Sequence, residues 1–175
     1  NASLDRYRGS ILGLAVGDAL GAPVEFKRPG SFDPVTDMSS GGAFGLRPGQ
    51  WTDDTSLALC LAESLVETNG FDLIDQLDRY VRWYREGYLS SNVDCFDIGN
   101  TCRQALHAFE DSGEPMSGST DPSSAGNGSI MRLAPVAMRW AHDPATAVEM
   151  AAQSSRTTHG TQEAVDGCRL LTAYL

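Results

Sequence analysis

The sequence lacks the features that mark several large classes of protein. Its 175 residues contain no run near the roughly 18 apolar residues of a membrane-spanning helix, and no signal peptide is visible. Its four cysteines form no CxxC pair and show no zinc-ligand spacing. These absences predict a chain without a membrane partner and with free thiols in a reducing compartment, which we interpret as the cytoplasm.

Positive charge is also scarce. Lysine and arginine number 13 against 23 aspartates and glutamates, which gives a formal net charge of −10. Such a chain gains nothing from the counterion release that drives binding to nucleic acids, so we expect no nucleic-acid partner. An acidic surface does tolerate divalent cations, and a bound cation can recruit an anionic ligand that the bare protein would repel.

The alternation of apolar and polar residues that is typical of strands is nearly absent, and helical spacing dominates. The sequence therefore predicts a compact all-α fold, one multi-helix domain over residues 1–175, with Asn1-Ala2 as a possible tag remnant. Helices are predicted over 3–22, 53–66, 73–87, 97–110 and 161–175, with one from Ser129 that is kinked at Pro135 and one capped by Asp143.

Four glycines recur every fourth residue in the first predicted helix, at positions 9, 13, 17 and 21. Each glycine inside a helix costs about 1 kcal/mol relative to alanine, so the regular spacing needs a reason. We interpret the stripe as a smooth surface for packing against a neighbouring helix. A ligand near its C-terminal end is compatible with that interpretation.

The segment "WTDDT" places two adjacent carboxylates where an apolar helical run begins. As a structural feature, Thr52 would be the N-cap, and Asp53 and Asp54 would interact with the helix dipole. As a functional feature, the hydroxyl and the two carboxylates could fan around a point beyond the helix end. Such hard oxygen donors suit magnesium or manganese.

Four further segments carry candidate functional residues. "GNGS" at 126–129 precedes an apolar run, so its amides could cup a phosphate, and Arg132 could pair with an anion. The alternative is a turn capped by Ser129. We interpret Asp97 as the N-cap of a helix. Glu25 and His159 could each have a structural or a functional role.

The order of these motifs is more specific than any one of them. GDALGAPVEF, WTDDTSLAL, FDIGNT, GNGSIMR and TTH follow one another along almost the whole chain. This series resembles the ADP-ribosylglycohydrolase family, the relatives of dinitrogenase-reductase-activating glycohydrolase and of the eukaryotic ADP-ribosyl hydrolases. The family is all-α and typically holds two Mg²⁺ or Mn²⁺ ions.

The resemblance implies a metal-dependent hydrolase that cleaves the C1″ glycosidic bond between ADP-ribose and a protein side chain. Its partner would be ADP-ribose or an ADP-ribosylated protein. The implied metal ligands are Thr52, Asp53 and Asp54, and the implied catalytic residues are Glu25 and Asp97. The implied ligand-binding residues are Asn100, Gly126, Asn127, Gly128, Ser129, Met131, Arg132 and His159, whereas Asp18 belongs to a motif without an assigned chemical step.

The chain departs from the family in one respect. The family's C-terminal part carries a second set of metal ligands in a motif like G-x-D-T-D, which this sequence does not contain. We therefore expect a truncated chain whose missing C-terminal segment completes the site. The alternatives are an inactive ADP-ribose-binding or structural relative, and a helical metal phosphohydrolase of the HD type built around His142-Asp143.

Overall fold

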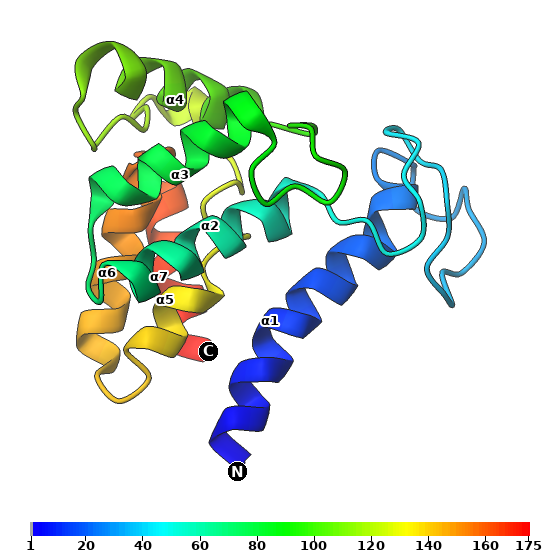
Figure 1. Cartoon of the computed structure of the whole chain (residues 1–175), viewed down its shortest axis with the longest axis horizontal. Helices are drawn as coiled ribbons and strands as arrows, with labels where there is room; N and C mark the ends of the chain where they lie inside the picture. The colour runs from blue at the N-terminus through cyan, green and yellow to red at the C-terminus, as the bar shows by residue number, and fades with distance from the viewer. Residues whose placement is uncertain (1) are drawn as a thin grey trace.

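The structure, a computed structural model, describes residues 2–175, so the interpretation of Asn1 lies outside it. Within that range it contains seven α-helices, two short 3₁₀ helices and no β-strand, which confirms the predicted all-α class (Figure 1). The α-helices are α1 (Ala2–Gly21), α2 (Asp53–Glu67), α3 (Leu73–Glu86), α4 (Asn100–Ser112), α5 (Ala134–Arg139), α6 (Pro144–Arg156) and α7 (Gln162–Tyr174). No helix of the described residues is both long and apolar enough to span a bilayer.

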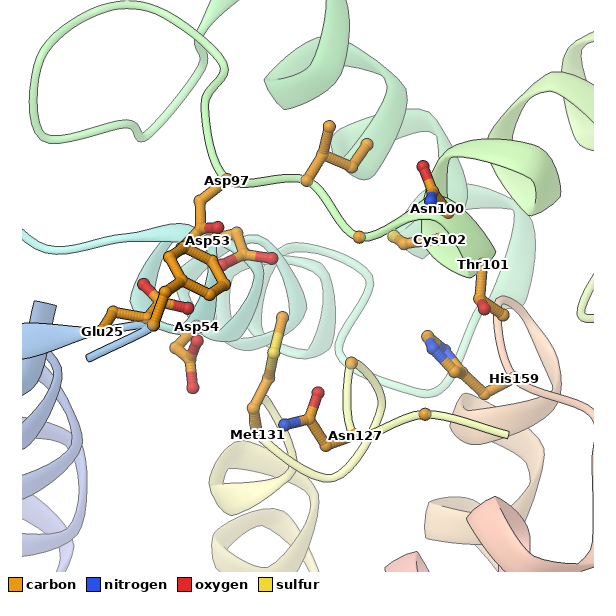
Figure 2. A pocket seen from close by; sticks show the side chains of 15 residues that line it. Glu25, Asp53, Asp54, Asp97, Asn100, Thr101, Cys102, Asn127, Met131 and His159 are labelled. Carbon is orange, nitrogen blue, oxygen red and sulfur yellow. The ribbon is translucent and has the colours of Figure 1, made fainter. Parts of the chain in front are cut away.

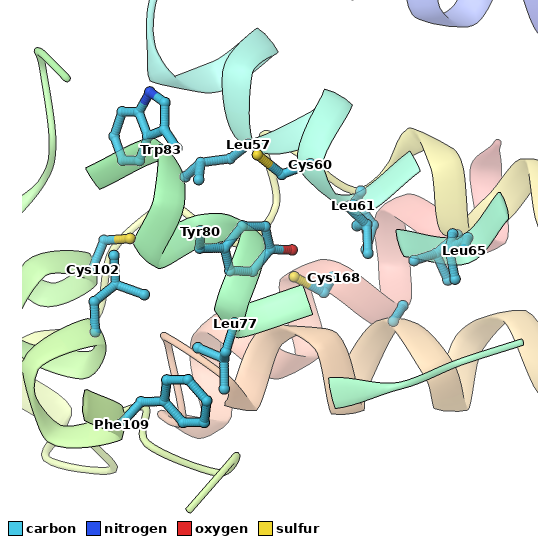
Figure 3. Packing of buried hydrophobic residues seen from close by; sticks show 14 residues of the cluster. Leu57, Cys60, Leu61, Leu65, Leu77, Tyr80, Trp83, Cys102, Phe109 and Cys168 are labelled. Atoms are coloured by element: carbon cyan, nitrogen blue, oxygen red, sulfur yellow. The ribbon is translucent and has the colours of Figure 1, made fainter. Parts of the chain in front are cut away.

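Buried side chains from α2, α3 and α4 form the centre of the core, and α5, α6 and α7 close it from the other side (Figure 3). Leu57, Leu61, Leu77 and Leu106 have no exposed surface. Each fully buried leucine stabilises the fold by about 2 kcal/mol through the hydrophobic effect. The core therefore fixes α2, whose first turn carries the paired aspartates.

Helix ends follow the local rules that the sequence suggests in several places. The side chain of Asp72 accepts hydrogen bonds from the amides of Ile74 and Asp75 at the start of α3. Gly87 ends that helix in the left-handed conformation, with φ of 68°. Asp143 caps α6 by accepting from the amide of Thr146, as predicted for an Asp-Pro pair.

Two predicted helix starts are wrong. The fourth helix begins at Asn100 and not at Asp97, because Asp97 has φ of 61°, which a right-handed helix cannot contain. The fifth begins at Ala134 and not at Ser129. Pro135 lies in its first turn, where proline is tolerated, and so produces no kink.

Helix α1 lies at one side of the body formed by the other helices (Figure 1). A β-carbon added at any of its four striped glycines would meet no atom within 4 Å. The packing partner predicted for this stripe is therefore not found among residues 2–175. The C-terminal end of α1 continues through the 3₁₀ helix Ala22–Val24 into the long loop that precedes α2.

Candidate active site

A hollow of about 450 Å³ gathers residues from five separate segments of the chain. Its lining comes from the loop after α1, the start of α2, the segment around the start of α4, the loop before α5 and the turn after α6. In Figure 2 the carboxylates of Glu25, Asp53, Asp54 and Asp97 lie at one end and His159 lies at the other. The hollow thus has an acidic end and an end built from a glycine-containing loop.

Burial and mutual repulsion disfavour ionisation at the acidic end. The pKa of Asp53 is raised to about 8, mainly by burial and then by the neighbouring Asp54. The same causes raise the pKa of Asp54 to about 6, with Asp18 as its strongest charged neighbour. Burial and then a hydrogen bond with Glu25 raise the pKa of Asp97 to about 7. Carboxylates packed in this way gain stability from any cation that enters.

Asp18 of α1 organises the start of α2. Its carboxylate accepts hydrogen bonds from the amide and hydroxyl of Thr52, at 3.0 and 2.9 Å. It also accepts from the amide and hydroxyl of Thr55, at 3.1 and 2.6 Å. Thr52 stands at the N-cap position but its side chain makes no capping bond, so the predicted hydroxyl cap is wrong and Asp18 supplies the acceptor.

The donors at this end suit a hard divalent cation in chemistry. The Thr52 hydroxyl oxygen lies 3.4 Å from Oδ2 of Asp54, close to the ~3 Å between adjacent oxygens around magnesium. Glu25 and Asp54 also border a second hollow, of about 230 Å³, that Thr52 lines. No three His, Cys, Asp or Glu side chains within the described residues form a ready metal site, so other donors must complete the coordination.

Two residues of the acidic end have unusual backbone conformations. Asp97 and Phe26 are both left-handed, with φ of 61° and 62°. Such a conformation costs roughly 1–2 kcal/mol for a residue with a side chain. Phe26 follows Glu25 directly, so the chain bends sharply at both proposed catalytic carboxylates.

Close approach to His159 explains the glycines at the opposite end. A β-carbon on Gly128 would lie 2.7 Å from Cε1 of the His159 ring, and one on Gly126 would lie 3.4 Å from Nε2. No hydrogen bond within residues 2–175 occupies the amides of residues 126–129. The amides of Gly126, Asn127 and Gly128 are therefore unpaired in residues that line the hollow, although the helix that follows begins only at Ala134.

His159 is held in a fixed and neutral state. Its Nδ1 lies 2.9 Å from the hydroxyl of Thr158, and the residue is 3% exposed. Burial lowers the pKa of the ring to about 4, with a further contribution from Arg132. At neutral pH the imidazole is therefore uncharged and offers one donor and one acceptor.

Arg132 and Ser129 lie behind the loop and do not line the hollow. The Arg132 side chain is fully buried, donates to the carbonyls of Gly128 and Ser154, and stacks on the Tyr80 ring with its guanidinium carbon 4.7 Å from the centroid. The Ser129 hydroxyl accepts a hydrogen bond from the Ser155 hydroxyl at 2.8 Å. The expected pairing of Arg132 with an anion does not hold in this geometry, because both side chains support the loop from inside.

The remaining predicted residues, except Thr52 of the second hollow, meet in one place. Ten of them line the hollow: Glu25, Asp53, Asp54, Asp97, Asn100, Gly126, Asn127, Gly128, Met131 and His159. The sequence reasoning missed five others: Phe26, Ile98, Gly99, Thr101 and Cys102. Phe26 adjoins Glu25, and the other four belong to the stretch that contains Asp97 and Asn100. Their position next to a predicted site residue is the only sequence feature that indicates a place in the hollow.

The HD-type alternative finds no support in the geometry. Asp143 is engaged as the cap of α6, and its side chain accepts from both the amide and the hydroxyl of Thr146. His142 lines a different hollow, between α1 and α5. Neither residue lies near the acidic end.

An all-helical chain with an acidic hollow beside free amide donors defines a candidate hydrolase of phosphorylated or nucleotide-linked substrates, and comparison with known proteins narrows this class. The ADP-ribosylglycohydrolase family model matches residues 1–175. The chain belongs to the ADP-ribosylglycohydrolase family, as its motif order predicts.

Named relatives agree with this assignment. The chain is 47% identical over 173 residues to ADP-ribosylarginine hydrolase Tri1 of Pseudomonas putida (strain GB-1), covering 99% of this chain and 46% of that protein. It is 36% identical over 162 residues to ADP-ribosyl-[dinitrogen reductase] glycohydrolase of Rhodospirillum rubrum, covering 89% and 51% respectively. The chain thus spans about half the length of these relatives.

A solved structure titled "ADP-ribosylglycohydrolase-related protein complex" has the same fold. Its TM-score to this chain is 0.84 at 45% sequence identity, and the match covers 97% of this chain and 54% of that one. The helical arrangement described above is therefore the arrangement of the matching half of a family member.

Proposed function

We propose that the protein is a hydrolase that removes ADP-ribose from arginine side chains of modified proteins. The support is the family membership together with the names of two relatives, one an ADP-ribosylarginine hydrolase and one a glycohydrolase acting on dinitrogen reductase. We further propose Mg²⁺ or Mn²⁺ as the cofactor, the cytoplasm as the location, and further polypeptide beyond these residues as the source of the remaining site.

One observation carries this proposal. A single hollow has four carboxylates at one end and, at the other, a loop with unpaired amides beside the neutral His159. The amides suit the diphosphate of ADP-ribose, since backbone N–H groups bind phosphate oxygens without adding charge. The carboxylates suit the ribose end, where positive charge develops at the anomeric carbon during cleavage.

In the reaction, water adds across the bond between C1″ and the guanidinium nitrogen. The hydroxyl goes to C1″, and a proton goes to the departing nitrogen. We propose that Asp97, with a pKa of about 7 and a hydrogen-bond partner in Glu25, carries that proton, because proton transfer is most effective when the pKa lies near the operating pH.

Thr52, Asp53 and Asp54 are the donors that this chain would offer to a divalent cation. Bound there, Mg²⁺ or Mn²⁺ would supply charge neutralisation and Lewis acidity toward ribose oxygens. Without a cation, ionisation of both Asp53 and Asp54 is unfavourable, since burial and repulsion raise both of their pKa values.

The test combines binding with release. Calorimetry would measure ADP-ribose binding to the full-length protein with Mg²⁺, and a release assay with the same protein would compare substrates carrying arginine-linked and serine-linked ADP-ribose. We expect binding and release from arginine, with both reduced at least tenfold in Asp54→Asn. Binding without release from either substrate would overturn the hydrolase assignment in favour of an ADP-ribose-binding relative. Absence of both would overturn the assignment of the hollow as well.

A further inference from the structure

Asp18 makes no contact that the proposed chemistry requires, yet it receives more hydrogen bonds than any other carboxylate near the hollow. Two amides and two hydroxyls, from Thr52 and Thr55, converge on its two oxygens at 2.6 to 3.1 Å. Asp18 comes from α1, 34 residues before Thr52. An acceptor brought from so far along the chain replaces the cap that the Thr52 side chain would otherwise make.

The consequence concerns the single proton of the Thr52 hydroxyl. Its oxygen lies 2.9 Å from Oδ1 of Asp18 and 3.4 Å from Oδ2 of Asp54. The shorter contact favours donation of the proton to Asp18 over donation to Asp54. A hydroxyl has one proton and two lone pairs, so this choice leaves its lone pairs available where Asp54 lies.

We propose that Asp18 is the positioning residue of the cation site: it fixes Thr52 as a lone-pair donor and holds the first turn of α2 in the geometry that a divalent cation needs. This inference rests on the metal site of the proposed function. It adds a residue that acts through Thr52 and does not itself touch substrate or metal. Ligands of metals are commonly oriented in this way by hydrogen-bonded partners.

The first experiment measures Mn²⁺ affinity by calorimetry and Mn²⁺ coordination by electron paramagnetic resonance in the full chain. Asp18→Asn should weaken Mn²⁺ binding at least tenfold, because one amide oxygen cannot accept from four donors. Asp18→Glu keeps the charge but displaces it by one methylene and should weaken binding similarly. Full affinity in Asp18→Glu would overturn the inference, since only charge would then matter.

Asp5→Asn is the matched control. It removes the same charge from the same helix, about 20 Å away along its axis, where the exposed Asp5 forms a 4.0 Å ion pair with Arg8. We expect this variant to retain the wild-type affinity. A loss equal to that of Asp18→Asn would show that overall charge, and not position, sets the affinity, and would overturn the inference.

A double-mutant cycle isolates the route through Thr52. If Asp18 acts in part by orienting the Thr52 hydroxyl, Asp18→Asn should weaken Mn²⁺ binding less in the Thr52→Val background than in the wild type, where the bonds to the first turn of α2 are also present. Losses that multiply in full would show independent roles and overturn the inference.

A measurement without metal separates this inference from the proposed function. Amide hydrogen exchange at Thr52 and Thr55 should accelerate at least tenfold in Asp18→Asn, while the amide of Leu61, deep in α2, stays unchanged. If wild-type chain binds no Mn²⁺, the metal site of the proposed function fails, and unchanged exchange at both threonines would overturn the positioning role itself.

Discussion

Gly128 illustrates how a single residue shapes the hollow. Its backbone has no positive φ, so conformational freedom is not the reason for a glycine at this position. The reason is the His159 ring, which leaves no room for a β-carbon. The sequence indicates that the glycines matter, but only the structure identifies the side chain that they accommodate.

Replacing Gly128 with alanine should therefore disturb the amide-bearing loop. The new β-carbon would approach the ring to 2.7 Å, which forces either the buried ring or the loop to move. We expect ADP-ribose affinity, measured by calorimetry, to fall at least tenfold.

Gly126→Ala is the matched control for this prediction. Its β-carbon would lie 3.4 Å from the same ring, at the edge of ordinary contact. A loss of less than threefold is expected there. Equal losses in the two variants would indicate that contact with His159 is not what requires glycine at 128.

At the scale of elements, the sequence predicts helices best where packing and local signals agree. The apolar spacing of α2 and α3 follows directly from their position over the core, so both lie within about two residues of their predicted bounds. The start of α4 was misplaced because Asp97 satisfies a local capping rule. In the fold it instead adopts a left-handed conformation that turns it toward Glu25.

The candidate site shows the same division. Residues in the motifs converge because the motifs lie at the ends of packed helices. The spacing of residues does not predict the direction of each side chain. It could not show that Arg132 points inward, to the last turn of α6 and the residues that follow it. The hydrogen bonds of Asp18 to residues 34 and 37 positions away were equally invisible to periodicity.

The long loop between α1 and α2 is tied to the acidic end by three aromatic rings. Phe44 of this loop lies 6.2 Å from Phe26 and 5.4 Å from Phe96, centroid to centroid. Phe26 follows Glu25, and Phe96 precedes Asp97. One side chain of the loop thus holds the neighbours of both proposed catalytic carboxylates.

Phe44→Ala should loosen this arrangement without unfolding the helical body. We expect amide exchange across residues 26–46 to accelerate at least tenfold and hydrolysis to slow, while exchange in α2 is unchanged. Aromatic pairs contribute about 0.5–1.5 kcal/mol beyond burial, which is enough for such a change. Val35→Ala, in the same loop, should have no comparable effect; identical exchange in both variants would contradict the role of the aromatic cluster.

For the whole molecule, the net charge of −10 and the carboxylates around the hollow predict how stability depends on pH. The pKa values of Asp53, Asp54 and Asp97 are raised on folding to about 8, 6 and 7. The folded chain therefore holds protons that the unfolded chain releases near pH 4. This contribution to stability is complete below about pH 4 and is lost as the pH rises toward 8.

With a chelator present, the Tm measured by calorimetry should fall between pH 6.5 and pH 8, above the range in which the lowered pKa of His159 makes stability rise with pH. Asp53→Asn should reduce that fall, because an amide does not ionise. A stability difference of 1 kcal/mol shifts the Tm of a chain this size by about 2–4 °C, so the change is measurable. Asp5→Asn should leave the fall unchanged. A wild-type Tm that rises steadily over this range would contradict the prediction.

Mn²⁺ should oppose the loss of stability at high pH. A ligand at one hundred times its Kd stabilises a folded protein by about 2.7 kcal/mol, or roughly 5–10 °C in Tm. Protons compete with the cation for Asp53 and Asp54, so the gain should be larger at pH 8 than at pH 5 and absent from Asp53→Asn/Asp54→Asn. Sodium chloride at equal ionic strength controls for screening of the acidic surface. A gain that is equal at both pH values, or that survives in the double variant, would mean that Mn²⁺ binds the acidic surface at large and not the start of α2.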